Sequence, residues 1–207
     1  MTNFNFDKTI LDLCGGSGSW SQPYADAGYD VQIVTLPSSD VIDFVPPPDV
    51  YGVLAAPPCD EFSIAKDHRI GRNIKHGMHT VNACIRIIWQ SRPKFWALEN
   101  PKGLLRKFLG KEKGSFQPWW YGDPWTKLTS LWGEFNFPEQ IYKEWEDVPK
   151  IPELYIRPGR SKPSIAFLHK SAKAHIPWMH KYPCSSDAAF RAITPAGFAK
   201  AFFEANR

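Results

Sequence analysis

The chain has 207 residues, enough for one well-buried α/β domain with a small appendage. Its 43% hydrophobic and 22% charged residues are ordinary for a globular protein, and no apolar run approaches the ~18 residues of a membrane span. The N-terminal sequence MTNFNFDKTI lacks the basic and apolar regions of a signal peptide, so we expect a cytoplasmic protein without a membrane partner. Cys14, Cys59, Cys84 and Cys184 have no CxxC spacing, which argues against a metal site or a disulfide framework.

The net charge of +4 is unevenly distributed along the chain. Between Lys150 and Tyr182 there are seven Lys or Arg residues and one acid, Glu153. Blocks of one sign are often solvated surface. Here, however, the cations alternate with Tyr, Phe and Trp, a pattern typical of surfaces that bind phosphates and bases.

Strands and helices are expected to alternate along the chain. The expected strands cover, in chain order, residues 8–13, 30–36, 49–56, 94–100 and 126–132. A first helix is expected from about Ser21 to Gly28, and a second follows the stripe Met78, Val81, Ile85 and Ile88. A last helix has Thr194 as N-cap, Pro195 at its first position, and Phe198, Ala201, Phe202 and Ala205 facing inward.

This alternation predicts an α/β fold with a doubly wound, mostly parallel sheet. Functional groups in such folds gather beyond the carboxyl ends of the strands. Cys59 follows one expected strand, where Pro57 and Pro58 fix its direction of exit, and Glu99 ends the next strand. A basic loop over residues 64–77 comes directly after Cys59.

Each of these features also has a purely structural interpretation. The turn CGGSGS (14–19) lets backbone approach a ligand, but it is also a plain strand-to-helix connection. Cys59 fits either a nucleophile or a buried filler, because a free thiol is reactive only as the thiolate. Glu99 fits either a helix cap or an acid positioned for chemistry.

Taken together, three motifs resemble those of the DNA cytosine-5 methyltransferases. LDLCGGSGSW is similar to the cofactor turn of this family, APPCDEFS to its Pro-Pro-Cys nucleophile loop, and ALENP to its Glu-Asn-Val motif. RAITPAGFAKAFFEAN resembles the closing helix of compact, often phage-borne members. The resemblance covers residues 9–133 and 190–206. It implies a class I S-adenosylmethionine-dependent methyltransferase fold, the cofactor S-adenosyl-L-methionine, and double-stranded DNA as substrate.

The resemblance also implies roles for single residues. Cys59 adds as a thiolate to carbon 6 of cytosine, so that carbon 5 becomes nucleophilic and can attack the methyl group. Glu99 neutralises the charge that develops at N3 and binds the exocyclic amine. Lys127 is the nearest cation for the cytosine carbonyl. Cytosine is unreachable inside a duplex, so the base must be flipped out, and the 64–77 loop is expected to close over it.

The resemblance implies cofactor binding only at positions that match the motifs of the family. These are Asp12, Cys14, Gly15, Gly16, Ser17, Gly18, Trp20, Asp40, Val41 and Pro57. The chain departs from the family at several of them. Cys14 replaces the phenylalanine usual beside the adenine, for which Trp20 is expected to compensate. Thr35 and Leu36 stand where an acid would bind the ribose, and Asp60 replaces a glutamine.

We expect a catalytic domain made of residues 1–133 and 190–207, and a reduced, loop-rich recognition region at 134–189. Arg157 and Arg160 flank a Pro-Gly turn tip, from which a guanidinium can pair with guanine. A region of this size has room to read on the order of 2–4 base pairs. The expected nucleic-acid contacts are Ser63, Lys66, Arg69, Arg72, Arg157, Arg160, Lys162, Lys170 and Lys173.

Several alternatives remain open at this point. The same chemistry acts on RNA in the tRNA-methylating branch of the family. A non-catalytic nucleic-acid-binding relative is a different class of protein, although intact Cys59 and Glu99 argue against it. The altered pocket also admits a modified adenosylmethionine that donates a group other than methyl. We expect a monomer without metal, acting in DNA methylation, restriction-modification or a phage function within a prokaryotic or phage-infected cell.

Overall fold

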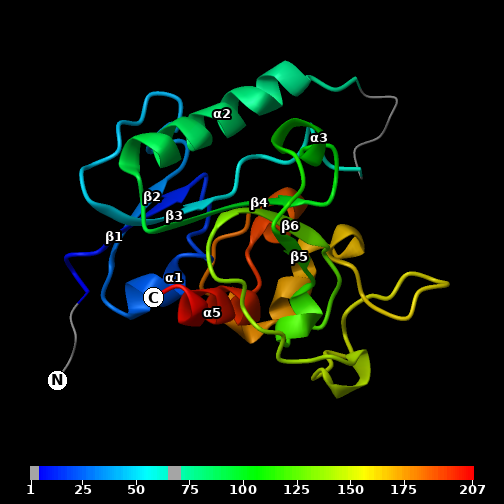
Figure 1. Cartoon of the computed structure of the whole chain (residues 1–207). Coiled ribbons are helices and arrows are strands. Elements are labelled where there is room, and N and C mark those ends of the chain that lie inside the picture. The colour runs from blue at the N-terminus through cyan, green and yellow to red at the C-terminus, as the bar shows by residue number, and fades with distance from the viewer. Residues whose placement is uncertain (1–4, 65–70) are drawn as a thin grey trace.

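A computed structural model of the protein describes residues 5–64 and 71–207, with a six-stranded sheet at its centre (Figure 1). The strands are β1 (Thr9–Leu13), β2 (Asp30–Val34), β3 (Val50–Ala55), β4 (Phe95–Pro101), β5 (Gly114–Phe116) and β6 (Thr129–Glu134). Their order in the sheet is β2-β1-β3-β4-β6-β5. The first four strands pair in parallel, whereas β6 is antiparallel to both β4 and β5.

Helices cover both faces of this sheet. The α-helices are α1 (Gln22–Asp26), α2 (Ile74–Ser91), α3 (Arg106–Leu109), α4 (Asp187–Ala192) and α5 (Ala196–Ala205). In Figure 1, α2 lies across one face, and α1 and α5 lie against the other. The expected doubly wound, mostly parallel α/β fold is therefore confirmed.

The two cores follow from the two-residue period of the strands, which sends successive side chains to opposite faces. Leu11, Val53 and Leu98 belong to the cluster under α2, which contributes Val81, Cys84, Ile87 and Ile88. Their neighbours Ile10, Leu54 and Ala97 belong to the opposite cluster, with Tyr24 of α1 and Phe198 and Phe202 of α5. Because both faces are apolar, the sheet is buried on both sides.

Residues 134–189 contain no α-helix that begins before Asp187, and after β6 ends at Glu134 they contain no named strand. Short 3₁₀ turns connect this region: η2 (Trp145–Asp147), η3 (Ile165–Phe167), η4 (Lys170–His175) and η5 (Pro177–Met179). Six residues of this region form a third apolar cluster together with Trp125, Phe190 and Ile193 of the flanking segments; the six are Leu154, Ile165, Leu168, Ile176, Met179 and Tyr182. The region is loop-rich, as expected, and it packs around an apolar core that it shares with the flanking segments.

Two helix boundaries differ from the expectation. The α2 helix begins at Ile74, where the Asn73 side chain accepts the His76 N–H at 3.0 Å, so part of the expected 64–77 loop is helical. At α5 the N-cap is Pro195 rather than Thr194, and the helix begins at Ala196. Within the described residues, no helix is both long and apolar enough to cross a bilayer.

Candidate active site

Cys59 and Glu99 meet at one edge of the sheet because β3 and β4 are neighbouring parallel strands. Ala55 pairs with Leu98, so both chains leave the sheet at the same level. The side chain of Asn100 then joins the two exits, since its Nδ2 donates a buried 3.0 Å hydrogen bond to the Pro57 carbonyl. The predicted proximity of the Pro-Pro-Cys and Glu-Asn-Pro segments is thus present in the structure.

The segment that carries Cys59 is held as a tight turn. The backbone N–H groups of Phe62 and Ser63 both donate to the Cys59 carbonyl, at 3.0 and 2.8 Å. Phe62 is fully buried, and Ser63 pairs with Gly103 in an isolated β-bridge. A Cβ on Gly103 would lie 2.3 Å from the Phe62 carbonyl oxygen, so only glycine permits this approach. Cys59 is therefore presented by backbone tied to the loop that follows Glu99.

Three charged neighbours act on the Cys59 thiol. Burial raises the pKa of Cys59, and the negative charges of Glu99 and Asp60 raise it further, whereas Lys127 lowers it. Since only the thiolate attacks carbon, this cysteine is held as a thiol while Glu99 carries its charge. A proton placed on Glu99 would remove the largest electrostatic obstacle to ionisation of Cys59.

Glu99 and Lys127 line one small cavity of about 10 Å³. The other lining residues are Trp20, Phe116, Thr129, Thr194, Pro195 and Phe198. Among the described residues, Oε2 of Glu99 is buried without a hydrogen-bond partner. Lys127 is fixed by a 3.0 Å hydrogen bond from its Nζ to the Arg191 carbonyl. The pair therefore offers an unused acceptor and a cation beside Cys59.

The glycine turn fits a ligand that contacts backbone. Gly16 has a φ of +53°, and a Cβ built on it would meet nothing within 4 Å, so this side of the turn is open. Gly15 and Gly18 are closed instead, because a Cβ would approach the Asp12 carboxyl at 2.4 Å and the Ile33 side chain at 2.6 Å. The turn thus has one open backbone face.

Within the part of the chain that the structure describes, the carboxylate of Asp12, beside the glycine turn, has one oxygen without a hydrogen-bond partner. It accepts a 2.6 Å hydrogen bond from the Ser21 hydroxyl, while its other oxygen is buried and unpaired within the described residues. Burial raises the pKa of Asp12 to about 6. An open glycine face beside an orphaned buried carboxylate oxygen fits a polar cofactor such as S-adenosylmethionine.

The remaining cofactor candidates divide into two places. Cys14 packs against the apolar cluster that contains Val41. Asp40 precedes Val41 in the chain, and its side chain accepts the Ile42 N–H at 2.9 Å. Trp20 is only 2% exposed and packs edge-on against Phe202, so it lies in the opposite core and lines the Glu99 cavity. The structure therefore does not bring Trp20 to the place expected of an adenine neighbour. Ser17, next to Gly16 and Gly18, and Pro57, which is buried, have no further role shown by their contacts.

The nucleic-acid candidates lie in several surroundings. Lys66 and Arg69 fall outside the described residues. Arg72 turns back toward its own loop and donates to the Glu61 and Ser63 carbonyls, both at 2.9 Å. Its guanidinium thus braces the turn that follows Cys59.

Five further candidates belong to the 134–189 region. Nζ of Lys170 donates to the Ser185 carbonyl at 2.9 Å, and Nζ of Lys173 donates to the Tyr182 carbonyl. Lys162 lies over the Trp119 ring at 4.5 Å. The last two candidates, Arg157 and Arg160, are the first and last residues of one turn. The Arg160 N–H donates a 3.0 Å hydrogen bond to the Arg157 carbonyl, and Gly159 between them has a φ of +78°. This confirms the expected Pro-Gly turn tip, which is of type II geometry.

Some residues that shape the site gave no signal in the sequence. Asn100 was predicted only as part of a motif, and the carbonyl it would bind was not. Arg86 of α2 holds the segment after Asp40 by donating to the carbonyls of Val41, Ile42 and Phe44 at 3.0 to 3.1 Å. Such bonds join residues more than 40 positions apart, and only the fold reveals them. No group of three or more potential metal ligands gathers within the described ranges.

A comparison with protein-family models agrees with a C-5 cytosine DNA methylase over part of the chain. Residues 30–116 match the sequence profile of the C-5 cytosine-specific DNA methylase family. The resemblance to the DNA cytosine-5 methyltransferases is thereby confirmed over a segment that holds both Cys59 and Glu99, while the glycine turn and α5 lie outside it. No curated relative matches the chain by sequence.

One solved structure is similar at 18% identity and a TM-score of 0.44. It is a protein described as a DNA modification methyltransferase encoded within an E. coli prophage. The similarity covers 61% of this chain and 46% of that one, so the chain matches less than half of the length of its structural relative.

Proposed function

We propose that this protein transfers a methyl group from S-adenosyl-L-methionine to carbon 5 of cytosine in double-stranded DNA. The observation that carries the proposal is the meeting of Cys59, Glu99 and Lys127 at the carboxyl edge of β3 and β4. Cys59 and Glu99 lie within the family-matched segment, residues 30–116, and Lys127 follows it. These are a nucleophile, an acid and a cation, the three kinds of group that the reaction needs at a cytosine ring.

The proposed order of events follows from the electrostatics. A proton shared between Glu99 and N3 of the flipped base cancels the negative charge that raises the pKa of Cys59. The Cys59 thiol then releases its proton to solvent and its sulfur forms a bond to carbon 6. Electron density of the opened carbon 5–carbon 6 double bond moves to carbon 5 as N3 takes the proton from Glu99. Lys127 supports the developing charge on the ring carbonyl. After methyl transfer, loss of the carbon 5 proton breaks the bond to Cys59.

S-adenosylmethionine supplies the electrophilic methyl group when it is bound. The open face of Gly16 and the unpaired oxygen of Asp12 are the groups proposed to hold it. Cys14 and Val41, in their shared apolar cluster, are proposed to flank the adenine ring. The Asp40 side chain, engaged with the Ile42 N–H, fixes the backbone of that segment.

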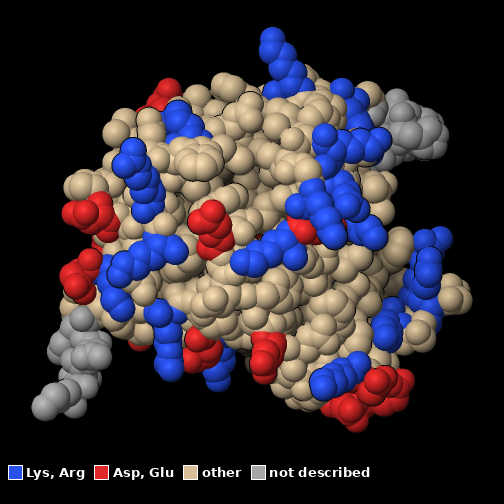
Figure 2. Space-filling view, in the orientation of Figure 1, with Lys and Arg blue, Asp and Glu red and all other residues tan. Residues whose placement is uncertain are grey.

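The proposed recognition region, residues 134–189, supplies DNA contacts beside a catalytic domain of residues 1–133 and 190–207. Six of the nine buried residues of the third apolar cluster belong to residues 134–189, which supports this division, and Trp125, Phe190 and Ile193 of the catalytic domain complete that cluster. In Figure 2, lysine and arginine side chains gather on the right of the molecule, over α3 and the loop near residue 160. The carboxyl ends of β3 and β4 point toward the same side in Figure 1. Extruded cytosine would thus enter between this positive side and the Cys59 turn.

The type II turn at Arg157–Arg160 is the proposed sequence-reading element. Pro158 and Gly159 form the corner of this turn, so Arg157 and Arg160 flank it on either side. An arginine in such a position can bind guanine in a bidentate manner. Arg157 is partly restrained by the Phe167 ring, 4.8 Å from its guanidinium carbon. Lys170 and Lys173 are proposed to contribute affinity without sequence choice, because cations that meet phosphates carry no base information.

Bisulfite sequencing of DNA from cells that express the chain tests this function. We expect cytosine methylation in one short sequence context with the wild type, and none with Cys59→Ala. Cys184→Ala, which alters a cysteine far from Glu99 in the chain, is the matched control and should methylate normally. Methylation of tRNA without methylation of DNA would establish the RNA alternative. DNA binding without methylation of either would show a non-catalytic relative.

A further inference from the structure

Asp123 is a buried carboxylate that the proposed chemistry does not use. It lies in the connection between η1 (Pro118–Tyr121) and β6 and is 4% exposed. Its Oδ2 accepts the Gly197 N–H at 3.0 Å, in the first turn of α5. The side chain of Trp178, in η5, is a hydrogen-bond donor beside this carboxyl that lowers the pKa of Asp123. One acid thus joins the closing helix of the catalytic domain to the recognition region.

The first turn of α5 is a wall of the candidate active site. Thr194, Pro195 and Phe198 line the cavity that also contains Glu99 and Lys127. Because α5 begins at Ala196 and its N-cap, Pro195, provides no side-chain cap, the first N–H groups of the helix need partners from elsewhere. Asp123 supplies a partner for the Gly197 N–H. Ser19 of the glycine turn fixes the residue before the N-cap by accepting the Thr194 N–H at 2.8 Å.

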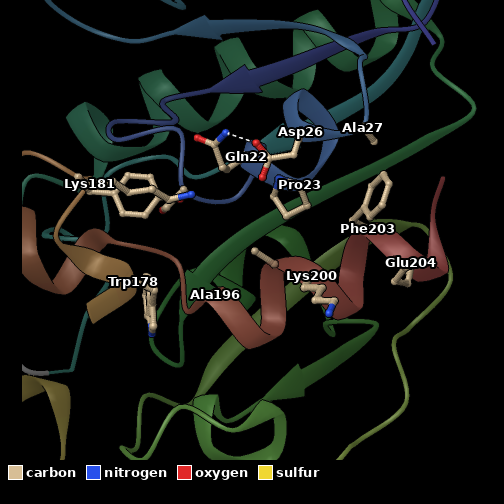
Figure 3. A pocket seen from close by; sticks show the side chains of 13 residues that line it. Gln22, Pro23, Asp26, Ala27, Trp178, Lys181, Ala196, Lys200, Phe203 and Glu204 are labelled. Atoms are coloured by element: carbon tan, nitrogen blue, oxygen red, sulfur yellow. Dashed lines mark hydrogen bonds between the residues drawn. The ribbon is translucent and has the colours of Figure 1, made fainter. Parts of the chain in front are cut away.

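The packing between the start of α5 and η1 leaves little room for either segment to move. A Cβ on Gly197 would stand 2.0 Å from the Tyr121 carbonyl oxygen, so the helix start rests directly on the backbone of η1. Trp178 stacks near Trp125 with ring centroids 6.3 Å apart, and it lines a groove of about 410 Å³ between α1 and α5 with Ala196 (Figure 3). A displacement of Asp123 would therefore shift both the start of α5 in the catalytic domain and Trp178 in the recognition region.

We propose that the ionised Asp123 carboxylate is a positioning residue, a clamp that holds the start of α5 and Trp178 in the geometry required at Glu99 and Lys127. This inference rests on the proposed methyl transfer for its consequence, but not for its geometry. Both partners of Asp123 are N–H donors, so only the charged form can accept from both at full strength. A protonated carboxyl would turn its own O–H toward two donors and weaken the clamp.

Ionisation of this group falls in an accessible pH range. Burial raises the pKa of Asp123 to about 7, against the smaller lowering by the Gly197 and Trp178 hydrogen bonds. Other titratable groups on the packed elements and the adjoining groove are Tyr121, Asp26, Lys181, Tyr182, Lys200 and Glu204. Burial raises the pKa of Tyr121 to about 12, so it stays neutral near pH 7. The charged residues of the groove, Asp26, Lys181, Lys200 and Glu204, are exposed to solvent.

The test compares the wild type with Asp123→Asn, which keeps the shape and an acceptor oxygen but cannot titrate. Between about pH 6 and pH 8 the ionised fraction of a carboxyl with a pKa of about 7 rises about tenfold. The ratio of wild-type to Asp123→Asn kcat/KM should rise by a similar factor, and the Cys59 contribution cancels in it. Asp147→Asn, an exposed acid of η2, should give a flat ratio. A flat ratio for Asp123→Asn as well would overturn the proposal.

A second readout is independent of methyl transfer. Hydrogen exchange of the amides at the start of α5, corrected for the intrinsic pH dependence, should slow as pH rises through about 7 in the wild type only. If neither protein methylates DNA, the proposed function fails, and this measurement alone decides the clamp. Equal pH dependence in both proteins would refute it.

Should Asp123→Asn fail to fold, Trp178→Phe provides the test. The ring stays, but the donor that lowers the pKa of Asp123 is removed, so the transition in exchange must move to higher pH. If the pH of the transition in hydrogen exchange is the same in Trp178→Phe and the wild type, ionisation of Asp123 does not cause that transition.

Discussion

Asn100→Ala should separate the nucleophile from the acid without touching either. The substitution removes the buried 3.0 Å hydrogen bond to the Pro57 carbonyl. A buried carbonyl left without a partner costs about 1–3 kcal/mol, but Oδ1 of Asn100 is itself unpaired among the described residues, and its loss offsets part of that cost. We therefore expect the free energy of unfolding to fall by about 1–2 kcal/mol, which lowers Tm by about 2–8 °C in a chain of this length.

The effect on the rate should exceed the effect on stability. Pro57 is two residues from Cys59, and a small misplacement of a reacting atom can cost on the order of 10²-fold in rate. Urea unfolding and initial rates of methyl transfer measure the two effects. Asn82→Ala, an exposed position on α2, is the control and should change the unfolding free energy by less than about 0.5 kcal/mol. If Asn100→Ala has the stability and the rate of the wild type, the hydrogen bond from Asn100 to the Pro57 carbonyl does not position Cys59.

Three further results are expected. Glu99→Gln should lower turnover by about 10²–10⁴-fold, while alkylation of Cys59 at pH 8 becomes faster because the charge that raises its pKa is gone; slower alkylation would contradict this coupling. Lys127→Met should raise the pKa of Cys59 further and shift the alkaline rise of kcat/KM to higher pH, and an unshifted profile would remove Lys127 from the site. Arg157→Ala and Arg160→Ala should relax the methylated motif in bisulfite sequencing, and an unchanged motif after both substitutions would place specificity elsewhere.

The sheet and the meeting of Cys59 with Glu99 could be predicted from sequence because both depend on local patterns. The apolar runs at 8–13, 49–56 and 94–100 are short and bounded by Gly or Pro, which favours buried parallel strands. Once these strands are parallel, their carboxyl ends must share an edge. The Pro-Gly turn at residues 158–159 was predicted for a similar reason, since the residue types required by the turn are adjacent in sequence.

The connections between segments could not be predicted in this way. The two bonds of Asp123 reach residues 55 and 74 positions away, and no periodic pattern encodes such pairs. The bonds from the Arg72 guanidinium to the Glu61 and Ser63 carbonyls were not predicted, whereas binding of nucleic acid by Arg72 stays a prediction. The start of α2 was missed because Asn73 caps it immediately after a basic loop.

The region at 134–189 shows a related limit. Its apolar residues, such as Leu154, Ile165 and Met179, have neither a two-residue nor a 3.6-residue spacing. They converge only when 3₁₀ turns and prolines fold the chain back on itself. Composition alone indicated that this region is loop-rich and basic, and it gave no means of finding its core.

Covalent trapping on DNA that contains 5-fluorocytosine tests the central claim most directly. Fluorine at carbon 5 cannot leave as a proton does, so the bond from Cys59 to carbon 6 cannot be broken after methyl transfer. We predict a stable adduct of wild-type protein with this DNA, mapped to the Cys59 peptide by mass spectrometry. Cys59→Ala should bind the same DNA without an adduct. Trapping of Cys59→Ala to the same extent as the wild type would contradict the assignment of the nucleophile and the mechanism built on it.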